Sequence, residues 1–218
     1  MSDPTSASPL PRILRALGVD GRDLASSTPL TGGTYNTVTR VTLTDGRDWV
    51  VKVPPPHSGG LRYERDLLVN GTTFSTAAAK AGIGGPAIPR LVHSEPDPTA
   101  PTGAYLVMTA CPGCPWHELD AVEDAGDEAR LRTELGFLIG RLHTTTGPGG
   151  FGCPAAPFGP PAATWRTAFT AMTEAVLADA VTYRAPLPYP VDRIRTVLAH
   201  AAPALDAVSR AANARSGG

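Results

Sequence analysis

Cysteine is scarce in this sequence, and long apolar segments are missing. The three cysteines are an odd number, whereas disulfide frameworks of small secreted proteins use even numbers, so we expect a reducing compartment. No segment approaches 18 consecutive apolar residues, and Met1–Pro11 is rich in Ser and Pro without the apolar region of a signal peptide. These absences predict a cytoplasmic protein that does not contact a membrane.

An excess of one charge is also lacking. Lys and Arg total 19 and Asp and Glu total 20, which gives a formal net charge of -1 and a pI near 6.5. No basic stripe is interleaved with aromatic residues, so nucleic acid is not an expected partner. The 42% of hydrophobic residues instead predicts a globular chain with a sizeable core, and 23 Gly and 23 Pro predict many loops.

The first half of the sequence is typical of an antiparallel sheet. Arg12–Gly18 predicts a short amphipathic helix that packs on this sheet and ends at glycine. Tyr35–Leu43 and Trp49–Val53 are rich in β-branched residues and predict a hairpin, with Asp45-Gly46 at its turn.

A helix and two further strands are expected next. The pattern predicts a helix over Leu61–Leu68 that resumes at Thr76–Ala81 and ends at a Gly/Pro breaker. Strands are predicted near Arg90–Ser94 and Ala104–Thr109. Together these elements predict an α+β fold with a five-stranded antiparallel sheet and one helix against it.

The pattern changes at Cys111-Pro-Gly-Cys-Pro, where helical periodicity replaces the strand signals. Helices are predicted at Glu128–His143, Trp165–Val181 and Val191–Val208. In the first of them leucines recur at three-to-four spacing. We expect this apolar stripe to be buried; its members are Leu131, Leu135, Leu138 and Leu142.

Lys52 lies within an apolar strand. Strand alternation places it on the face of Val50, opposite Trp49, Val51 and Val53. A cation in this position needs an acidic partner or a bound anion, and protein kinases use a strand lysine to reach nucleotide phosphates and a helix carboxylate. The alternative is a charge that protects an exposed edge strand.

Glu64 follows Lys52 by twelve residues and lies in the predicted helix. The apolar positions around it place it near the side of the helix that faces the sheet, where it could pair with Lys52. The alternative is a solvated glutamate among the charged residues Arg62, Arg65 and Asp66.

Gly32 and Gly33 precede the first strand of the hairpin. Glycines let backbone amides approach a phosphate closely. The segment matches neither Gly-x-x-x-x-Gly-Lys-Ser/Thr nor Gly-x-Gly-x-x-Gly, and a plain turn is the alternative. The informative feature is the order along the chain: a glycine turn, a strand lysine, a helix glutamate, two more strands, a Pro-Gly linker and helices.

In this order the sequence resembles the aminoglycoside phosphotransferase family, small-molecule relatives of protein kinases. The resemblance covers residues 25–152 well and residues 153–208 loosely. The segments that carry it are Thr31–Asn36, Val50–Val53, Glu64, Pro86–Val92, Tyr105–Gly113, Leu135–His143 and Gly150–Gly152.

The resemblance implies a two-lobed, protein-kinase-like fold. It assigns residues 25–110 to a five-stranded N-lobe and residues 117–208 to an incomplete helical C-lobe, joined by a hinge at residues 111–116. Residues 1–24 would form a tail with the short helix, and residues 209–218 a loose end.

The resemblance also implies an activity, the phosphorylation of a hydroxyl group on a small molecule by ATP or GTP with magnesium. Lys52 would hold the α- and β-phosphates, Glu64 would orient Lys52, and Val50 would cover the base. The backbone of the glycine turn would cover the phosphates, and the strand before the hinge would contact the purine edge. The residues implied in nucleotide binding are Gly32, Gly33, Thr34, Val50, Lys52, Glu64, Met108, Thr109 and Ala110.

One family motif is missing from the sequence. Members carry a His-Gly-Asp-x-x-x-x-Asn loop, whose Asp acts on the acceptor hydroxyl and whose Asn binds magnesium. None of the five histidines is followed by Gly-Asp. Because phosphoryl transfer needs a metal clamp and a positioned acceptor, we expect a truncated or frameshifted fragment that binds nucleotide with little turnover. The alternative is that a partner supplies the missing loop. An incomplete C-lobe would also leave Leu135, Leu138 and Leu142 partly uncovered, which favours self-association.

The cysteines support a different hypothesis. Cys111, Cys114, His117 and Cys153 supply the ligand types of a Cys3His structural zinc site, so the alternative function is a non-catalytic interaction module. Cys153 lies about forty residues from the others and two prolines stiffen the first pair. A redox pair at Cys111 and Cys114 is a further alternative, although the context is not that of a thioredoxin-like unit.

Overall fold

The computed structural model divides into two compact units. The first comprises residues 1–58 and 84–112, and the second comprises residues 59–83 and 113–218. The residues described are 8–33, 35–55, 61–64, 66–83, 88–114, 125–144, 149–154 and 158–208.

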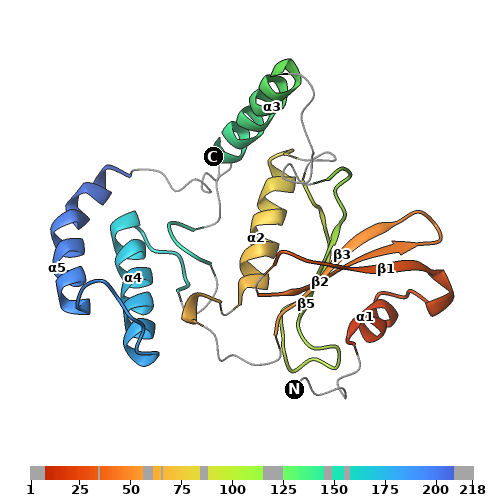
Figure 1. Ribbon diagram of the computed structural model, residues 1–218, viewed down its shortest axis with the longest axis horizontal. Helices are drawn as coiled ribbons and strands as arrows, with labels where there is room; N and C mark the ends of the chain where they lie inside the picture. Colours follow the sequence, from red (N-terminus) through yellow and green to blue (C-terminus); the bar gives the residue numbers. More distant parts are fainter. Residues whose placement is uncertain are drawn as a thin grey trace. The chain divides into compact units, whose positions relative to one another are not determined.

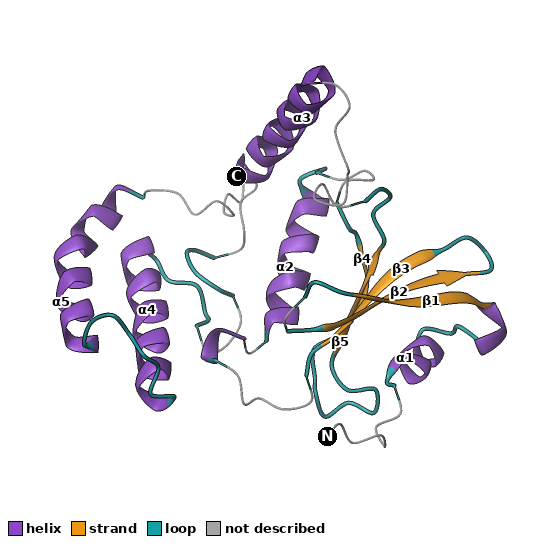
Figure 2. Ribbon diagram, viewed as in Figure 1, coloured by secondary structure: helices purple, strands orange, loops and turns teal. Residues whose placement is uncertain are grey.

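Helices and strands follow one another along the chain as Figures 1 and 2 label them. The short 3₁₀ segments among the described residues, η1, η2 and η4, lie between or after them. In order, the elements are α1 (Leu10–Ala16), η1 (Gly21–Asp23), β1 (Leu24–Leu30), β2 (Thr37–Leu43), β3 (Asp48–Val53), η2 (Arg62–Glu64), α2 (Leu67–Lys80), β4 (Leu91–Glu95), β5 (Tyr105–Thr109), α3 (Ala125–Thr144), α4 (Trp165–Thr182), α5 (Val191–Ala201) and η4 (Ala202–Ala207).

The first unit is built on a five-stranded antiparallel sheet with strand order β1-β2-β3-β5-β4. β2 and β3 form the predicted hairpin, with Val41 opposite Trp49. At its turn Gly46 has a φ of 85°, which favours glycine, and the Arg47 N–H donates to the Asp45 carboxylate at 3.0 Å. The predicted sheet, its hairpin and the α+β class are confirmed.

α1 packs on one face of this sheet. Ile13 is fully buried and Leu14 is 5% exposed. The sheet contributes alternate residues to the same apolar cluster because side chains on a strand alternate between its two faces. The packing predicted for the first helix is therefore confirmed, and the sheet residues of this core are Val41, Leu43, Trp49, Val51, Tyr105 and Val107.

β1 is a strand that the sequence patterns did not locate. Its side chains after Leu24 are exposed, so it carries no alternation of apolar and polar residues. It also contains Pro29, which cannot donate a backbone hydrogen bond and is tolerated at the edge of a sheet. β1 forms this edge and pairs only with β2 in the sheet order.

The helix predicted over residues 61–68 is wrong. Arg62–Glu64 form a single 3₁₀ turn, and α2 then runs without a break from Leu67 to Lys80. Asp66 lies between the two in the left-handed conformation, with a φ of 55°. This backbone reversal stops the turn from continuing into α2, so Glu64 belongs to the turn and not to a helix.

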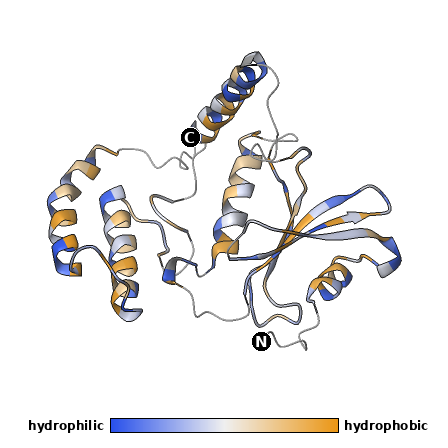
Figure 3. Ribbon diagram, viewed as in Figure 1, coloured by the Kyte–Doolittle hydropathy of each residue, from blue (hydrophilic) through white to orange (hydrophobic). Residues whose placement is uncertain are grey.

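α3 forms over the predicted residues, but its apolar stripe is not buried. Leu135 is 50% exposed, whereas Leu131, Leu138 and Leu142 are half-buried. Figure 3 shows hydrophobic and hydrophilic segments side by side on this helix. No described helix or strand packs extensively on α3, so the expected partial exposure of Leu135, Leu138 and Leu142 is confirmed and their full burial is not.

The two last helices form where the sequence predicts them. α4 and α5 are joined by an ion pair between Glu174 and Arg195, at 3.0 Å. α5 ends at Ala201, earlier than predicted, and continues as the 3₁₀ segment η4, because Pro203 has no N–H for the helical ladder. Among the described helices, none has both the length and the apolar character that a membrane span requires.

Candidate functional site

Lys52 projects from the sheet face opposite α1. Its neighbours Trp49 and Val51 are buried in the core with α1, and Val53 packs against that core. Lys52 and Val50 are half-buried, as expected for the other face. The predicted alternation along β3 is confirmed.

The strand register defines what surrounds Lys52 on that face. Val38 and Leu106 lie opposite Lys52 on the two flanking strands, and Met108 lies opposite Val50. Residues directly opposite in an antiparallel pair share one face. Leu106 and Met108 are 3% and 8% exposed. Lys52 therefore stands at one end of an apolar strip, formed by Val38, Val50, Leu106 and Met108.

The position of β3 bears on the alternative interpretation of Lys52. β3 lies in the middle of the strand order, between β2 and β5, so Lys52 does not protect a sheet edge. Within the described part of the sheet unit, its ammonium forms no ion pair. A compact cation on a central strand, without an acidic partner in its sheet, suits an anionic ligand.

An ion pair occupies the same face toward the start of β3. Arg40 and Asp48 approach within 2.5 Å, and the Arg40 Nε–H donates to both carboxylate oxygens at 3.1 Å. The hydrogen bond from Arg40, followed by its charge, holds the pKa of Asp48 below its usual value although desolvation opposes this. On this face, the ion pair lies at one end of the apolar strip and Lys52 lies at the other end.

We expect Asp48→Asn to lower the free energy of unfolding by about 0.5 to 1 kcal/mol at neutral pH, since the pair is partly exposed. The folded pKa of Asp48 is lowered, so the contribution is complete above the unfolded pKa of about 3.9. It is lost as the pH falls through the folded pKa, where the carboxylate becomes protonated.

Urea unfolding of both proteins between pH 7 and roughly pH 2 measures this difference. Glu134→Gln, which removes an exposed pair with Arg130 on α3, is the control and should change stability less. A difference for Asp48→Asn that does not depend on pH would contradict the charge pairing.

The strand before the hinge limits how a purine could be contacted. The N–H of Thr109 donates to the Arg90 carbonyl, and the N–H of Ala110 donates to the Asp48 carbonyl, both at 2.9 Å. These two donors are used within the sheet. Contacts of Met108–Ala110 with a base stay a prediction, and the backbone N–H groups of Thr109 and Ala110 would not supply them.

The glycine turn lies between β1 and β2. Gly32 has a φ of 95°, and a side chain there would meet nothing within 4 Å, so the requirement for glycine is conformational and the space beside it is open. Thr34 lies outside the described residues. The side-chain oxygen of Asn36 is buried without a hydrogen-bond partner among the described residues.

Glu64 lies in the second unit, on the turn η2. Its Oε2 accepts a hydrogen bond from the Leu61 N–H at 2.8 Å, so the side chain is folded back on its own turn. The pairing of Glu64 with Lys52 stays a prediction, because the two residues belong to different units.

Sequence reasoning missed Asp179, which is 4% exposed in α4. Both of its carboxylate oxygens bind Arg62, one accepting from the Arg62 N–H at 2.7 Å and the other lying 3.0 Å from Nε. The only signal in the sequence is an acidic residue between two alanines in a helical segment. Nothing in the sequence indicates its partner 117 residues away.

The cysteines do not form a described metal cluster. Cys111, Cys114 and Cys153 carry free thiols, and the Cys153 sulfur lies 4.0 Å from the sulfur of Met172. His117 lies outside the described residues. Within the described ranges, no group of three or more His, Cys, Asp and Glu side chains could hold a metal ion, and the Cys3His site stays a prediction because one of its four ligands lies outside those ranges.

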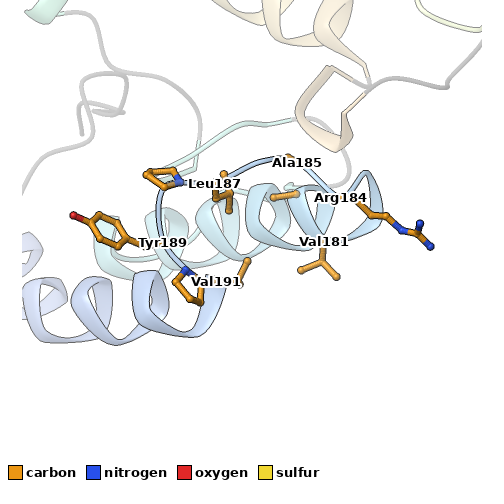
Figure 4. Close-up of a pocket in the computed structure, with 9 residues that line it drawn as sticks. Val181, Arg184, Ala185, Leu187, Tyr189 and Val191 are labelled. Carbon is orange, nitrogen blue, oxygen red and sulfur yellow. The ribbon is translucent and has the colours of Figure 1, made fainter.

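An open pocket of about 460 Å³ lies beside the connection from α4 to α5. In Figure 4 the side chains of Arg184 and Tyr189 extend in opposite directions, so its polar groups do not converge on one point as they do in ligand sites. The lining residues are Ala180, Val181, Arg184, Ala185, Leu187, Pro188, Tyr189, Pro190 and Val191.

Comparison with known proteins identifies the family. No curated protein matches the chain. One similar solved structure is described as the complex structure of Rv3197-erythromycin from Mycobacterium tuberculosis, with 17% sequence identity and a TM-score of 0.42. The match covers 66% of this chain and 47% of that one, so this chain spans about half of that protein's length. A model of the phosphotransferase enzyme family (APH) matches residues 26–213, most of the sequence, and the chain therefore belongs to this family.

Proposed function

We propose that the chain binds a nucleoside triphosphate, ATP or GTP with magnesium, on the sheet face opposite α1. The observation that carries the proposal is the position of Lys52. This residue is on a central strand, at the end of the apolar strip, and has no ion pair in the described sheet unit. Membership of a phosphotransferase family supports the same ligand.

Each part of this face has a role that its chemistry supports. The apolar strip offers a surface for the base, with Val50 and Met108 in contact with it. Lys52 would hold the α- and β-phosphates by charge-assisted hydrogen bonds. Gly32 and Gly33 would let the backbone amides of the turn approach the phosphates.

Magnesium would neutralise phosphate charge when it is bound. The His-Gly-Asp-x-x-x-x-Asn motif, whose Asn would be a magnesium ligand, does not occur in the 218 residues. We therefore expect this chain to bind nucleotide with little phosphoryl transfer. In this proposal the acceptor is a small molecule with a hydroxyl group.

Calorimetric titration of the chain with ATP and with GTP, in the presence of magnesium, tests the proposal. We expect saturable binding of at least one of them, with a Kd between about 1 µM and 1 mM. At a hundred times its Kd, the nucleotide should raise the free energy of unfolding by about 2.7 kcal/mol.

Adenosine and guanosine are the matched controls, because they present the base without the phosphates. They should bind more weakly than the triphosphates, since Lys52 contributes only to phosphate binding. If neither triphosphate binds up to millimolar concentration, the proposed function is wrong.

A further inference from the structure

The side chain of Asn36 carries a buried oxygen that the fold does not use. Its Oδ1 is buried and has no hydrogen-bond partner among the described residues. The other atom of this kind is the Nε of Arg166, whose guanidinium is paired with Asp206. A buried acceptor without a donor costs free energy, so such an atom needs an explanation. At the edge of a binding site, the explanation is a donor that arrives with the ligand.

The sheet register places Asn36 close to Lys52, within the first unit. Asn36 directly precedes β2, whose Val38 lies opposite Lys52 on β3. The alternation of β2, continued by one residue, puts Asn36 on the face of Val38 and Lys52. The glycine turn lies against the same residue, since a Cβ on Gly33 would be 3.9 Å from the backbone oxygen of Asn36. Asn36 therefore stands where the glycine turn joins the proposed nucleotide site.

The order of residues along this face indicates which part of a nucleotide would reach Asn36. Val50, with Met108 opposite it, comes before Lys52 along β3, and Asn36 comes after Lys52. With the base on Val50 and the α- and β-phosphates at Lys52, the base and the sugar lie on the side of Lys52 away from Asn36. The terminal phosphate then points toward Asn36. Ionised phosphate oxygens are acceptors, so they cannot supply the donor that Oδ1 lacks.

The hydrated magnesium ion of the nucleotide can supply it. Magnesium keeps several waters and is commonly bound through few protein oxygens together with substrate phosphates. An amide oxygen suits this ion and its waters. The Asp48 carboxylate of this face is paired with Arg40 at the other end of the apolar strip. Asn36 thus offers a free oxygen at the phosphate end, which is the chemistry that the ion requires.

We propose that Asn36 is a magnesium-contacting residue, whose Oδ1 accepts a hydrogen bond from a water of the magnesium ion bound to the terminal phosphates. The inference rests on the proposed function, because it assumes a nucleotide held by Lys52 on this face. It gives the buried Oδ1 the donor that the described residues do not supply. It also gives the chain an oxygen for magnesium that does not belong to a His-Gly-Asp-x-x-x-x-Asn motif.

The test measures ATP binding by the full chain in magnesium and in EDTA, for the unmodified chain and for Asn36→Leu. If the chain binds only GTP, the titrations use GTP. The measured quantity is the ratio of the Kd without magnesium to the Kd with magnesium. Leucine has a similar size but no oxygen, so we expect Asn36→Leu to reduce this ratio about tenfold. The Kd without magnesium should stay close to that of the unmodified chain.

Three further variants sharpen the result. Asn36→Asp keeps an oxygen at this place and should give a ratio at least as large as that of the unmodified chain. Asn36→Ala removes the oxygen without adding apolar bulk, should reduce the ratio as Asn36→Leu does, and serves if Asn36→Leu does not fold. Thr37→Val removes the hydroxyl of the next residue, which is exposed at the start of β2, and is the control that should leave both Kd values unchanged.

The outcomes separate this inference from the proposed function. Equal losses of affinity with and without magnesium would mean that Asn36 acts on the nucleotide or on Lys52, and would overturn the magnesium contact while nucleotide binding stands. An unchanged ratio in Asn36→Leu and Asn36→Ala, or a ratio reduced equally in Asn36→Asp, overturns it too. So does an unmodified chain whose affinity does not depend on magnesium. Absence of ATP and GTP binding by the unmodified chain overturns the proposed function and the inference with it.

Discussion

Lys52→Ala is expected to weaken nucleotide binding about tenfold to a hundredfold. The lysine would donate charge-assisted hydrogen bonds to the phosphates, and bonds to charged groups contribute about 1.5 to 3 kcal/mol each. The loss of one such interaction corresponds to this change in Kd. Calorimetric titration with ATP and GTP in the presence of magnesium measures it directly.

The chain supplies a matched control for this substitution. Lys80 is the other lysine of the sequence and lies in the last turn of α2, so Lys80→Ala removes the same charge at a position without a proposed role. Its Kd should equal that of the unmodified chain. The Kd of Lys52→Arg should lie between that of the unmodified chain and that of Lys52→Ala, because the guanidinium keeps the charge but is larger and planar.

Folding has to be separated from binding in this experiment. Lys52 has no ion pair in the described sheet unit, so Lys52→Ala should change the free energy of unfolding by less than about 0.5 kcal/mol in the absence of nucleotide. If Lys52→Ala folds normally and binds nucleotide with an unchanged Kd, Lys52 is not part of the site.

The surroundings of Lys52 were predictable because strand alternation is a local property. Trp49, Val51 and Val53 alternate with Val50 and Lys52 in the sequence, and the structure separates them onto two faces. Alternation does not say which strands flank β3. The pairing with β5, which places Leu106 and Met108 beside Lys52 and Val50, depends on contacts more than fifty residues apart in the chain.

The misassigned region around Glu64 shows where local patterns are insufficient. Leu61–Leu68 has the composition of a helix, but the left-handed Asp66 divides it. The turn before this break is held by Asp179, far along the sequence. Such a contact leaves no periodic signal, so neither the turn nor Asp179 could be predicted from sequence.

Periodicity also cannot say what covers an apolar stripe. The leucines of α3 recur correctly for an amphipathic helix and the helix forms, yet Leu135 is half exposed and Phe137 is 74% exposed. The pattern predicts which side of a helix is apolar. The partner of that side is a separate question, which depends on the rest of the fold.

α1 is the element whose contribution to stability is most directly testable. It precedes residues 26–213, which match the family model, yet Ile13 is fully buried against the sheet. A seven-residue helix is not stable by its own hydrogen bonds. Its position must come from the apolar contacts of Ile13 and Leu14 with the sheet.

Ile13→Ala should therefore lower the free energy of unfolding by about 2 to 5 kcal/mol, as large-to-small changes in a packed core do. Ile13→Val should cost about 0.5 to 1.5 kcal/mol, and Arg12→Ala, at an exposed position of the same helix, should cost less than about 0.5 kcal/mol. Urea unfolding followed by circular dichroism gives the three values. A loss for Ile13→Ala no larger than that for Arg12→Ala would mean that α1 does not belong to the core, whereas the graded series would show that the sheet bearing Lys52 depends on residues that precede the family match.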